Sequence, residues 1–383
     1  MNLLFVWSCM SGFIADAWQA LARIPDVQLK IFIEERVNNM TRFDLDETLH
    51  GLDYTLINEN ASSMAYARLD EDAIAFQPDM IFIVGWRRRL PRHFALSRRF
   101  NYVSKVLIFD LPFAFTLKKF IAPFVLRSYL RHFVGCFVPK TSAVQYAQWL
   151  GFKGGIDGGP KGGLGWIDDR LESVNVRKFD GIAKRRQSLS KWPKRFLYVG
   201  RYASEKGVPM LVRAYRRYRL LAVRDGGDVA QLWRLDCCGA GPLARLFENE
   251  SGVQDLGFVQ PSTLPEIMLE HGAFVIASSR EAWGAVIAEA AAAGLPIVCT
   301  ETCGAAMELV KKNGVICKVG DVESMAHAML RLHRMDDDSL AAMGMRGIAL
   351  AEPYSSENWA LSCLELAEKT RDGWGGRCGR TNP

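Results

Sequence analysis

Residues 273–300 read AFVIASSREAWGAVIAEAAAAGLPIVCT, and their pattern predicts a strand, a loop, a helix and a second strand. The short apolar run that ends before Ser278 is typical of a buried strand. The helix is expected to begin near Ala285 and to run through Ala293, with Gly294 as its C-cap and Pro296 just beyond. Strands joined through a helix in this way lie parallel in one sheet, so the stretch indicates an α/β fold.

Two glutamates, Glu281 and Glu289, stand among the small and apolar residues of this stretch. A charged carboxylate in such surroundings is costly unless something binds it. Glu281 falls in the loop and Glu289 about one turn into the helix, so both are expected to face the strand ends. Between them lie the first-turn amides of Gly284, Ala285 and Val286, which have no partners within the helix. Amides that bind phosphate beside carboxylates that bind hydroxyls indicate a nucleotide sugar.

A second candidate site lies upstream, in YVGRYASEKGVP over residues 198–209. Arg201 and Lys206 follow a predicted strand and precede a helix that Pro209 can open. Two cations beside a helix N-terminus form a site for an anion, most simply a diphosphate. Taken alone, the motif fits a solvated loop with ordinary surface charges equally well.

A third motif, GAGPLA, matches the dinucleotide fingerprint G-x-G-x-x-A at Gly239, Gly241 and Ala244. The residues that follow, PLARLFEN, are expected to form a helix. A lone match of this kind is weak, and a simple turn after a strand explains it equally well. It leaves open a nicotinamide-dependent oxidoreductase, although that function gives no role to Glu281 and Glu289.

The whole chain of 383 residues is long enough for two domains, and 49% hydrophobic and 23% charged residues are typical of globular proteins. Apolar runs alternate with helical segments in both halves, which predicts two Rossmann-like lobes facing a central cleft. The expected parts are an acceptor lobe over 1–175, a helix-poor linker over 176–194, a donor lobe over 195–345, a C-terminal helix over 346–371 and a flexible tail over 372–383.

Cysteine usage and hydropathy restrict the compartment. The nine cysteines are scattered without zinc-ligand spacing, so we expect reduced thiols and no metal site. The apolar start, MNLLFVWSCMSGFIADAW, lacks a basic leader and is interpreted as a buried strand rather than a signal peptide. No uncharged apolar stretch is long enough to span a membrane. These features favour a cytoplasmic protein.

The segment from Gly85 to Lys140 is strongly basic, with twelve Lys and Arg and a single acid, Asp110. Such a concentration indicates an anionic partner, although a solvated basic face is the alternative. Nucleic acid is not expected because no nucleic-acid-binding motif is present. Apolar residues are interleaved with the charges, which predicts peripheral contact with an anionic membrane. The predicted surface is the basic segment from Arg87 to Arg131, with Phe115, Phe120, Ile121 and Phe124 as its apolar residues. A helix that carries Lys118, Lys119, Arg127 and Arg131 is expected within it, and Pro123 is expected to kink or break that helix.

The E-x7-E pattern from Glu281 to Glu289, with GRYASEKG and GAGP upstream in order, resembles the GT-B retaining glycosyltransferases of family 4, the glycosyl transferases group 1. The resemblance covers Phe196 to about Leu332. The first half is similar, more loosely, to the acceptor lobes of relatives that act on surface or exported glycans. The resemblance implies a GT-B fold whose last helix crosses back to the first lobe, where Leu361, Leu364 and Leu366 would pack.

The resemblance also implies a role for each candidate residue. Arg201 and Lys206 would neutralise the donor diphosphate, and Glu281 would hold the sugar hydroxyls. The amides of Gly284, Ala285 and Val286 would bind the phosphate, and Glu289 would bind the ribose. Val259 would contact the base, and Gly12 would approach the donor phosphates from the other lobe. Gly239 and Gly241 would make further contacts with the donor.

The implied reaction moves a hexosyl or related glycosyl unit from a nucleotide-diphosphate sugar to an acceptor hydroxyl, with retention and without a metal or cofactor. The acceptor would be a saccharide or lipid-linked molecule in surface polysaccharide or lipopolysaccharide synthesis, reached at the inner face of the cytoplasmic membrane. Asp110 is the best catalytic carboxylate of the acceptor lobe, with a helix-capping aspartate as the alternative. A catalytically inactive nucleotide-sugar-binding protein stays open as a further alternative.

Overall fold

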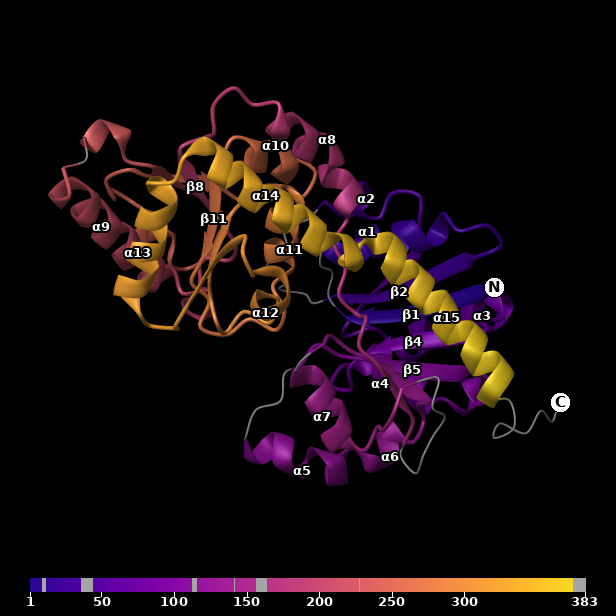
Figure 1. Cartoon of the computed structure of the whole chain (residues 1–383). Helices are drawn as coiled ribbons and strands as arrows, with labels where there is room; N and C mark the ends of the chain where they lie inside the picture. The colour runs from indigo at the N-terminus through magenta and orange to yellow at the C-terminus, as the bar shows by residue number, and fades with distance from the viewer. Residues whose placement is uncertain are drawn as a thin grey trace. The chain divides into compact units, whose positions relative to one another are not determined.

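The computed structural model describes residues 1–8, 12–35, 44–111, 116–140, 142–155, 164–226 and 228–374. The chain divides into two units (Figure 1). Unit 1 combines residues 1–173 with 356–383, and unit 2 is the continuous stretch 174–355. Each unit contains a parallel sheet with helices, so the predicted pair of Rossmann-like lobes is confirmed.

Unit 1 contains a seven-stranded sheet in the order β3-β2-β1-β4-β5-β6-β7. Its strands are β1 Asn2–Ser8, β2 Gln28–Glu35, β3 Asp53–Asn58, β4 Met80–Val84, β5 Ser104–Ile108, β6 Gly135–Phe137 and β7 Trp166–Asp168. Its helices are α1 Gly12–Ala22, α2 Leu45–Thr48, α3 Ser63–Phe76, α4 Arg89–Leu96, α5 Leu117–Val125, α6 Arg127–Leu130, α7 Ser142–Leu150 and α15 Ser356–Trp374.

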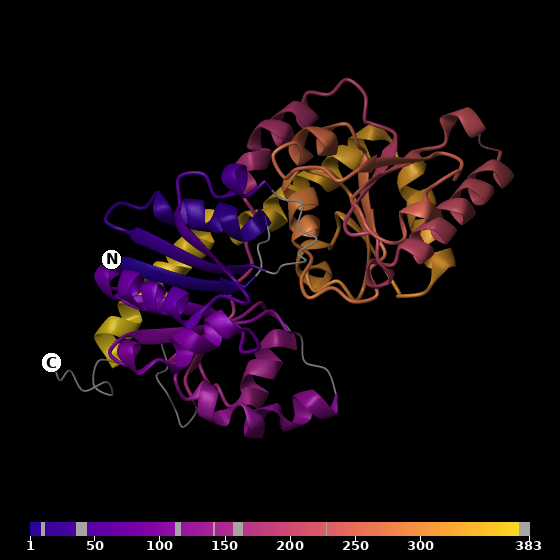
Figure 2. The same cartoon turned by 180° about the vertical axis from the view of Figure 1, so that it is seen from behind.

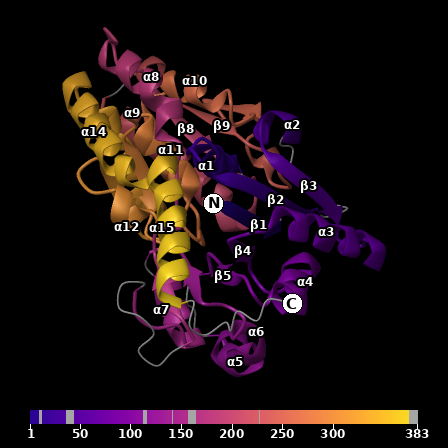
Figure 3. The same ribbon diagram turned by 90° about the vertical axis from the view of Figure 1, so that its right-hand side faces the viewer.

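The core of unit 1 includes the end of the chain. Helix α15 packs beside α1 along the sheet (Figure 3). Its Trp359, Cys363 and Leu366 are buried in the same apolar cluster as Phe5 of β1. Burying large side chains of this kind contributes roughly 2 kcal/mol each, so unit 1 is incomplete without its last helix.

Unit 2 contains a six-stranded parallel sheet in the order β10-β9-β8-β11-β12-β13. Its strands are β8 Arg195–Val199, β9 Arg234–Cys238, β10 Val253–Gly257, β11 Ala273–Ile276, β12 Ile297–Thr300 and β13 Gly314–Cys317. Its helices are α8 Val176–Gln187, α9 Val208–Arg224, α10 Leu264–Leu269, α11 Ala285–Ala292, α12 Ala306–Leu309, α13 Val322–His333 and α14 Asp337–Ala351. Helices α9 and α13 pack side by side, as both views show (Figures 1 and 2).

Residues 176–187 of the expected linker over 176–194 instead form helix α8, and the whole stretch belongs to unit 2. Phe179 and Ile182 are buried in the unit 2 core. The buried Arg186 donates to the carbonyls of Ala293, at 2.9 Å, and His271, at 2.8 Å. These carbonyls follow helices α11 and α10, where helical carbonyls lack partners. Burial lowers the pKa of Arg186 to about 10.

The predicted C-terminal helix over 346–371 is two helices. Helix α14 belongs to unit 2 and stops at Ala351, because Pro353 cannot continue a helix. Helix α15 then begins at Ser356, in unit 1. Of the three leucines predicted to pack on the first lobe, Leu366 is buried and Leu364 is partly buried. Leu361 is exposed, so the prediction is wrong for this residue.

None of the helices over the described residues has the length and apolarity needed to cross a bilayer.

Candidate functional site

The candidate site of unit 2 lies where β8 and β11 run side by side. Their carboxyl ends are neighbours, although the chain forms β9 and β10 between them on the other side of β8. Ligands of open α/β sheets bind at this kind of switch point, since the loops that leave the two strands separate there. The two loops are tied together, because the Ser279 amide donates to the Glu205 carbonyl at 2.9 Å.

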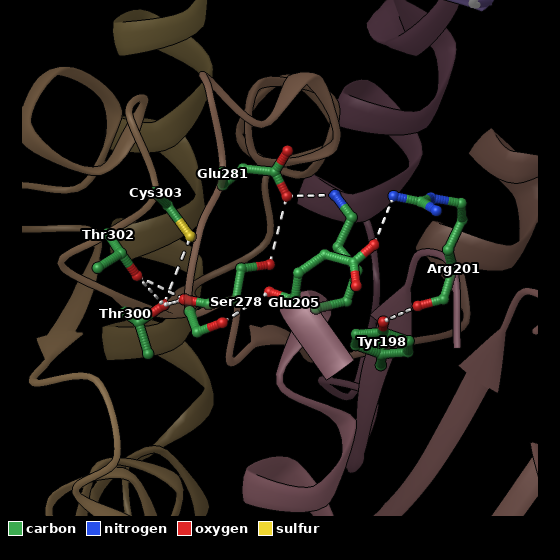
Figure 4. Close-up of polar contacts among 10 residues, drawn as sticks. Tyr198, Arg201, Glu205, Ser278, Glu281, Thr300, Thr302 and Cys303 are labelled. Carbon is green, nitrogen blue, oxygen red and sulfur yellow. Dashed lines mark hydrogen bonds and ion pairs between the residues drawn. The ribbon is translucent and has the colours of Figure 1, made fainter. Parts of the chain in front are cut away.

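Lys206 and Glu281 form an ion pair across these two loops. Their side chains are only 18% and 14% exposed, which strengthens the pair relative to one in bulk water. Ser278 donates its hydroxyl to the same carboxylate at 3.3 Å (Figure 4). The sequence therefore brings a predicted phosphate-binding cation and a predicted sugar-binding carboxylate into contact.

Arg201 lies beside this pair and is held by Glu205. The Arg201 guanidinium donates to the Glu205 carboxylate at 2.7 Å, and Figure 4 shows the Glu205 side chain between those of Arg201 and Glu281. The backbone amide of Glu205 and the Arg201 guanidinium lower the pKa of the Glu205 carboxyl. Tyr198, whose pKa is raised mainly by burial, donates its hydroxyl to the Arg201 carbonyl at 2.9 Å. Glu205 is not among the predicted site residues, because Arg201 precedes the short helix Ser204–Lys206 and no helical spacing rule links the two side chains.

The loop that carries Glu281 is fixed from β12. Thr300 and Thr302 both donate their hydroxyls to the Ser278 carbonyl (Figure 4). The Glu281 amide donates to the Thr302 carbonyl at 3.3 Å. Cys303, whose burial raises the thiol pKa to about 11, packs behind this loop as a neutral group. The Glu281 carboxylate is therefore presented from a backbone that is held on two sides.

Helix α11 begins next to this carboxylate. Gly284 precedes the helix with a φ of 99°, a left-handed conformation that glycine adopts without strain. An added Cβ there would lie 3.1 Å from the Glu281 side chain. Ala285 and Val286 occupy the first turn, where amides are available to an anion, and Glu289 lies one turn further along. The predicted helix over 285–293 is confirmed to within one residue.

The glycines of GAGPLA serve close packing. Gly239 and Gly241 follow β9, and a Cβ on Gly239 would lie 2.0 Å from the Gly200 carbonyl oxygen. The expected helix after them is wrong, because Ala244–Leu246 is a single 3₁₀ turn. The motif therefore lacks the helix N-terminus that a dinucleotide-binding fingerprint needs. Val259 follows β10 and is partly buried at the same edge of the sheet.

Unit 1 has its own candidate site at the equivalent edge of its sheet. A pocket of about 380 Å³ lies beyond the ends of β1, β4 and β5 and is lined by Trp7, Trp86, Arg87, Asp110 and Glu172 among others. Asp110, the predicted catalytic carboxylate, is exposed and lines this pocket, whereas the two tryptophans and Glu172 were not among the predicted site residues. Gly12 is the first residue of α1.

The structure thus brings Arg201, Lys206, Glu281 and the start of α11 together, whereas Asp110 and Gly12 belong to unit 1. The predicted membrane residue Phe115 lies outside the described residues. Over the described ranges, no group of three or more His, Cys, Asp or Glu side chains is arranged to hold a metal.

The two sheets, each with its switch point, define the fold as that of the GT-B glycosyltransferases. An Escherichia coli structure described as trehalose-6-phosphate bound with UDP-2-fluoro glucose superposes with a TM-score of 0.70 at 14% identity, over 96% of this chain and 99% of its own. The Anabaena protein HepE in complex with UDP and glucose gives 0.67 at 16% identity, over 96% and 99%.

Residues 193–335, which include the unit 2 site, match the family model described as glycosyl transferases group 1. The O-antigen chain mannosyltransferase B of Escherichia coli is 29% identical over 177 residues, 44% of this chain and 44% of that protein. A glycogen synthase of Mycobacterium tuberculosis is 30% identical over 212 residues, 54% of this chain and 48% of that protein. The match therefore spans less than half the length of these curated relatives.

Proposed function

We propose that this protein is a retaining glycosyltransferase that moves a hexosyl or related unit from a nucleotide-diphosphate sugar to an acceptor hydroxyl. The observation that carries the proposal is the gathering of Arg201, Lys206, Glu281 and the first turn of α11 at one switch point. That gathering falls inside the segment that matches the glycosyl transferases group 1.

The donor would bind with its charges matched by this site. Arg201 and Lys206 would face the diphosphate, and its β-phosphate would replace Glu281 as a partner of Lys206. Freed from that ion pair, Glu281 could accept hydrogen bonds from sugar hydroxyls. The amides of Gly284, Ala285 and Val286 would hold phosphate oxygens, Glu289 the ribose, and Val259 the base.

Leaving-group stabilisation is the chemistry that this chain's residues can supply. As the glycosidic bond breaks, negative charge grows on the diphosphate, and fixed cations beside it lower the barrier. Arg201 is positioned for this by Glu205 and Tyr198. We propose that no metal or cofactor is needed, so transfer is expected to persist in EDTA.

The acceptor would enter the pocket of unit 1, lined by Trp7, Trp86 and Glu172. Aromatic faces and carboxylates suit a saccharide, since the rings pack on its C–H faces and the carboxylates accept its hydroxyl hydrogens. Similarity to the O-antigen chain mannosyltransferase supports a role in surface polysaccharide or lipopolysaccharide synthesis. The seven cysteines in the described residues are free and buried, in keeping with a cytoplasmic location.

A thermal-shift panel of UDP-, GDP- and ADP-sugars, with NADH included, tests the donor site. One nucleotide sugar is expected to raise the melting temperature of the wild type but not of Lys206→Ala or Glu289→Ala. Lys311→Ala, an exposed lysine of the same unit, is the matched control and should keep the shift. Stabilisation by NADH alone, or an equal shift in all variants, would contradict the proposal.

Transfer itself separates an enzyme from an inactive nucleotide-sugar-binding protein. With the donor found in the panel, NMR of the product of a saccharide acceptor gives the anomeric configuration. An anomer unlike that of the donor would refute retention, and donor binding without any transfer or hydrolysis would favour the inactive binding protein.

A further inference from the structure

Helix α5 of unit 1 turns its apolar stripe outward. Leu117, Phe120 and Phe124 follow helical spacing and are 76%, 57% and 74% exposed. Helices of globular proteins ordinarily bury such a stripe, yet only Ala122 of α5 is buried. Phe120 and Phe124 are the only phenylalanines among the exposed large hydrophobic side chains of the described residues.

The stripe is held in place by α7. Pro123 lies inside α5 and has no amide hydrogen, so the Lys119 carbonyl loses its helical partner. The Trp149 indole donates to that carbonyl at 3.1 Å and brings its ring to 5.4 Å from the ring of Phe120. Helix α5 continues past Pro123 to Val125, with the Trp149 indole of α7 replacing the lost hydrogen-bond donor. The expected break falls at Leu126, between α5 and α6, rather than at Pro123 itself.

Positive charge surrounds these apolar side chains. Lys118, Arg127 and Arg131 are exposed on α5, α6 and the residue after it. The sequence has no Asp or Glu from residue 111 to residue 156. A surface that carries only basic charges is complementary to an anionic partner, and large apolar side chains exposed among those charges are typical of surfaces that bind anionic membranes.

We propose that this surface docks on an anionic phospholipid bilayer. We call it the α5 surface and define it by the apolar residues Leu117, Phe120, Ile121, Phe124, Val125 and Trp149 with the basic residues Lys118, Arg127 and Arg131. The apolar side chains enter the boundary between head groups and acyl chains, the tryptophan lies at that boundary, and the basic side chains bind lipid phosphates.

The α5 surface also limits where the pocket of unit 1 lies relative to the lipid. Leu111 lines the pocket and Leu117 begins α5 six residues later. Six residues of chain span at most about 22 Å. A docked α5 surface therefore keeps the pocket close to the bilayer, within reach of a saccharide whose anchor stays in the membrane.

Co-sedimentation of the full chain with vesicles tests the proposal without any nucleotide sugar, so its result does not depend on the proposed function. The wild type is expected to bind vesicles of phosphatidylglycerol and phosphatidylcholine in equal parts and to bind pure phosphatidylcholine vesicles far less. The double variants Phe120→Ser with Phe124→Ser, and Lys118→Glu with Arg127→Glu, should each weaken binding about tenfold or more. All four side chains are exposed, and of the four only Phe120 makes a ring contact with a described residue, Trp149, so any fall in melting temperature should be small.

Matched controls lie in unit 2. Leu220→Ser with Val223→Ser removes two exposed apolar side chains of α9, and Lys311→Glu with Lys312→Glu reverses two exposed charges. Both should bind vesicles as the wild type does. Equal wild-type binding to both vesicle types, or binding that survives either α5 double variant, would overturn the proposal. A dimer in gel filtration that Phe120→Ser with Phe124→Ser dissociates, without vesicle binding, would assign the surface to a second copy instead.

Discussion

The two units place their sites at the same point of the same topology. In unit 1 the switch point lies between β1 and β4, and in unit 2 between β8 and β11. Beyond the strands of unit 2 stand the ion pair Lys206–Glu281 and two loops in close backbone contact. Beyond the strands of unit 1 lies an open pocket with two tryptophans. The comparison teaches that topology decides where a ligand binds, whereas the loop side chains decide which chemistry is bound.

The largest loss of activity is expected when the lysine of the unit 2 site is replaced. Lys206→Ala leaves the Glu281 carboxylate without its lysine and takes one charge from the proposed leaving group. We expect kcat/KM to fall about 100- to 1,000-fold, in line with the loss of a fixed group that stabilises transition-state charge. Steady-state transfer assays measure this. If kcat/KM falls no further in Lys206→Ala than in Lys311→Ala, Lys206 does not stabilise the leaving group and the proposed donor site of unit 2 is wrong.

Close packing of the unit 2 loops gives the next effect. Gly239→Ala sets a Cβ against the Gly200 carbonyl and should lower the free energy of unfolding by about 2 kcal/mol. Gly181→Ala, in helix α8 of the same unit, has open space around its Cβ and should be neutral or slightly stabilising. Urea unfolding compares the two. If Gly239→Ala is as stable as the wild type, the loops of unit 2 tolerate a larger residue at this position.

The pocket of unit 1 is expected to respond differently. Glu172→Gln keeps the shape of a buried pocket residue and removes its charge. We expect the KM for the acceptor to rise about tenfold, as for the loss of a charged hydrogen bond, while the nucleotide-sugar thermal shift is unchanged. Asp169→Asn, on an exposed neighbour, is the control. If Glu172→Gln loses the thermal shift with the nucleotide sugar, the donor and the acceptor are not bound by separate units as proposed.

The smallest effect is a pH dependence in unit 2. Burial, and then the charges of Lys194 and Arg334, lower the pKa of His333 from 6.5. As the pH falls, His333 is therefore protonated in the unfolded chain at a higher pH than in the folded protein. The contribution of His333 to stability is complete above about pH 6.5 and is lost as the pH falls toward its folded pKa.

In His333→Gln, the melting temperature should consequently fall less between about pH 7.5 and pH 5.5 than in the wild type. His327→Gln, on the exposed face of the same helix, should behave as the wild type does. A pH dependence that is identical in all three proteins would show that the burial of His333 has no energetic consequence.

Most of both sheets could be predicted because their strands are continuous apolar runs. The exceptions have physical reasons. Strand β3 lies at the sheet edge with only Ile57 buried, and β7 has three residues, too few for a period. Helix α8 was missed because basic residues dominate its composition, although Val176, Phe179 and Ile182 follow a helical spacing.

The site was predictable where a motif fixes residue type and spacing together, as in the loops of Lys206 and Glu281. Supports that reach across the fold were not predictable. The hydroxyls of Thr300 and Thr302 meet the Ser278 carbonyl only because β11 and β12 are neighbours. The pocket of unit 1 likewise draws Trp7, Trp86 and Glu172 from segments far apart in the chain, and no spacing rule links them.

The place of α15 has a consequence for biosynthesis. Unit 2 is a continuous stretch, whereas unit 1 waits for Trp359, Cys363 and Leu366 to complete its core. On the ribosome, unit 1 is therefore begun before unit 2 and completed only after it. The side of its sheet that α15 covers must therefore stay exposed while all of unit 2 is synthesised, and apolar surface exposed in this way is prone to aggregation.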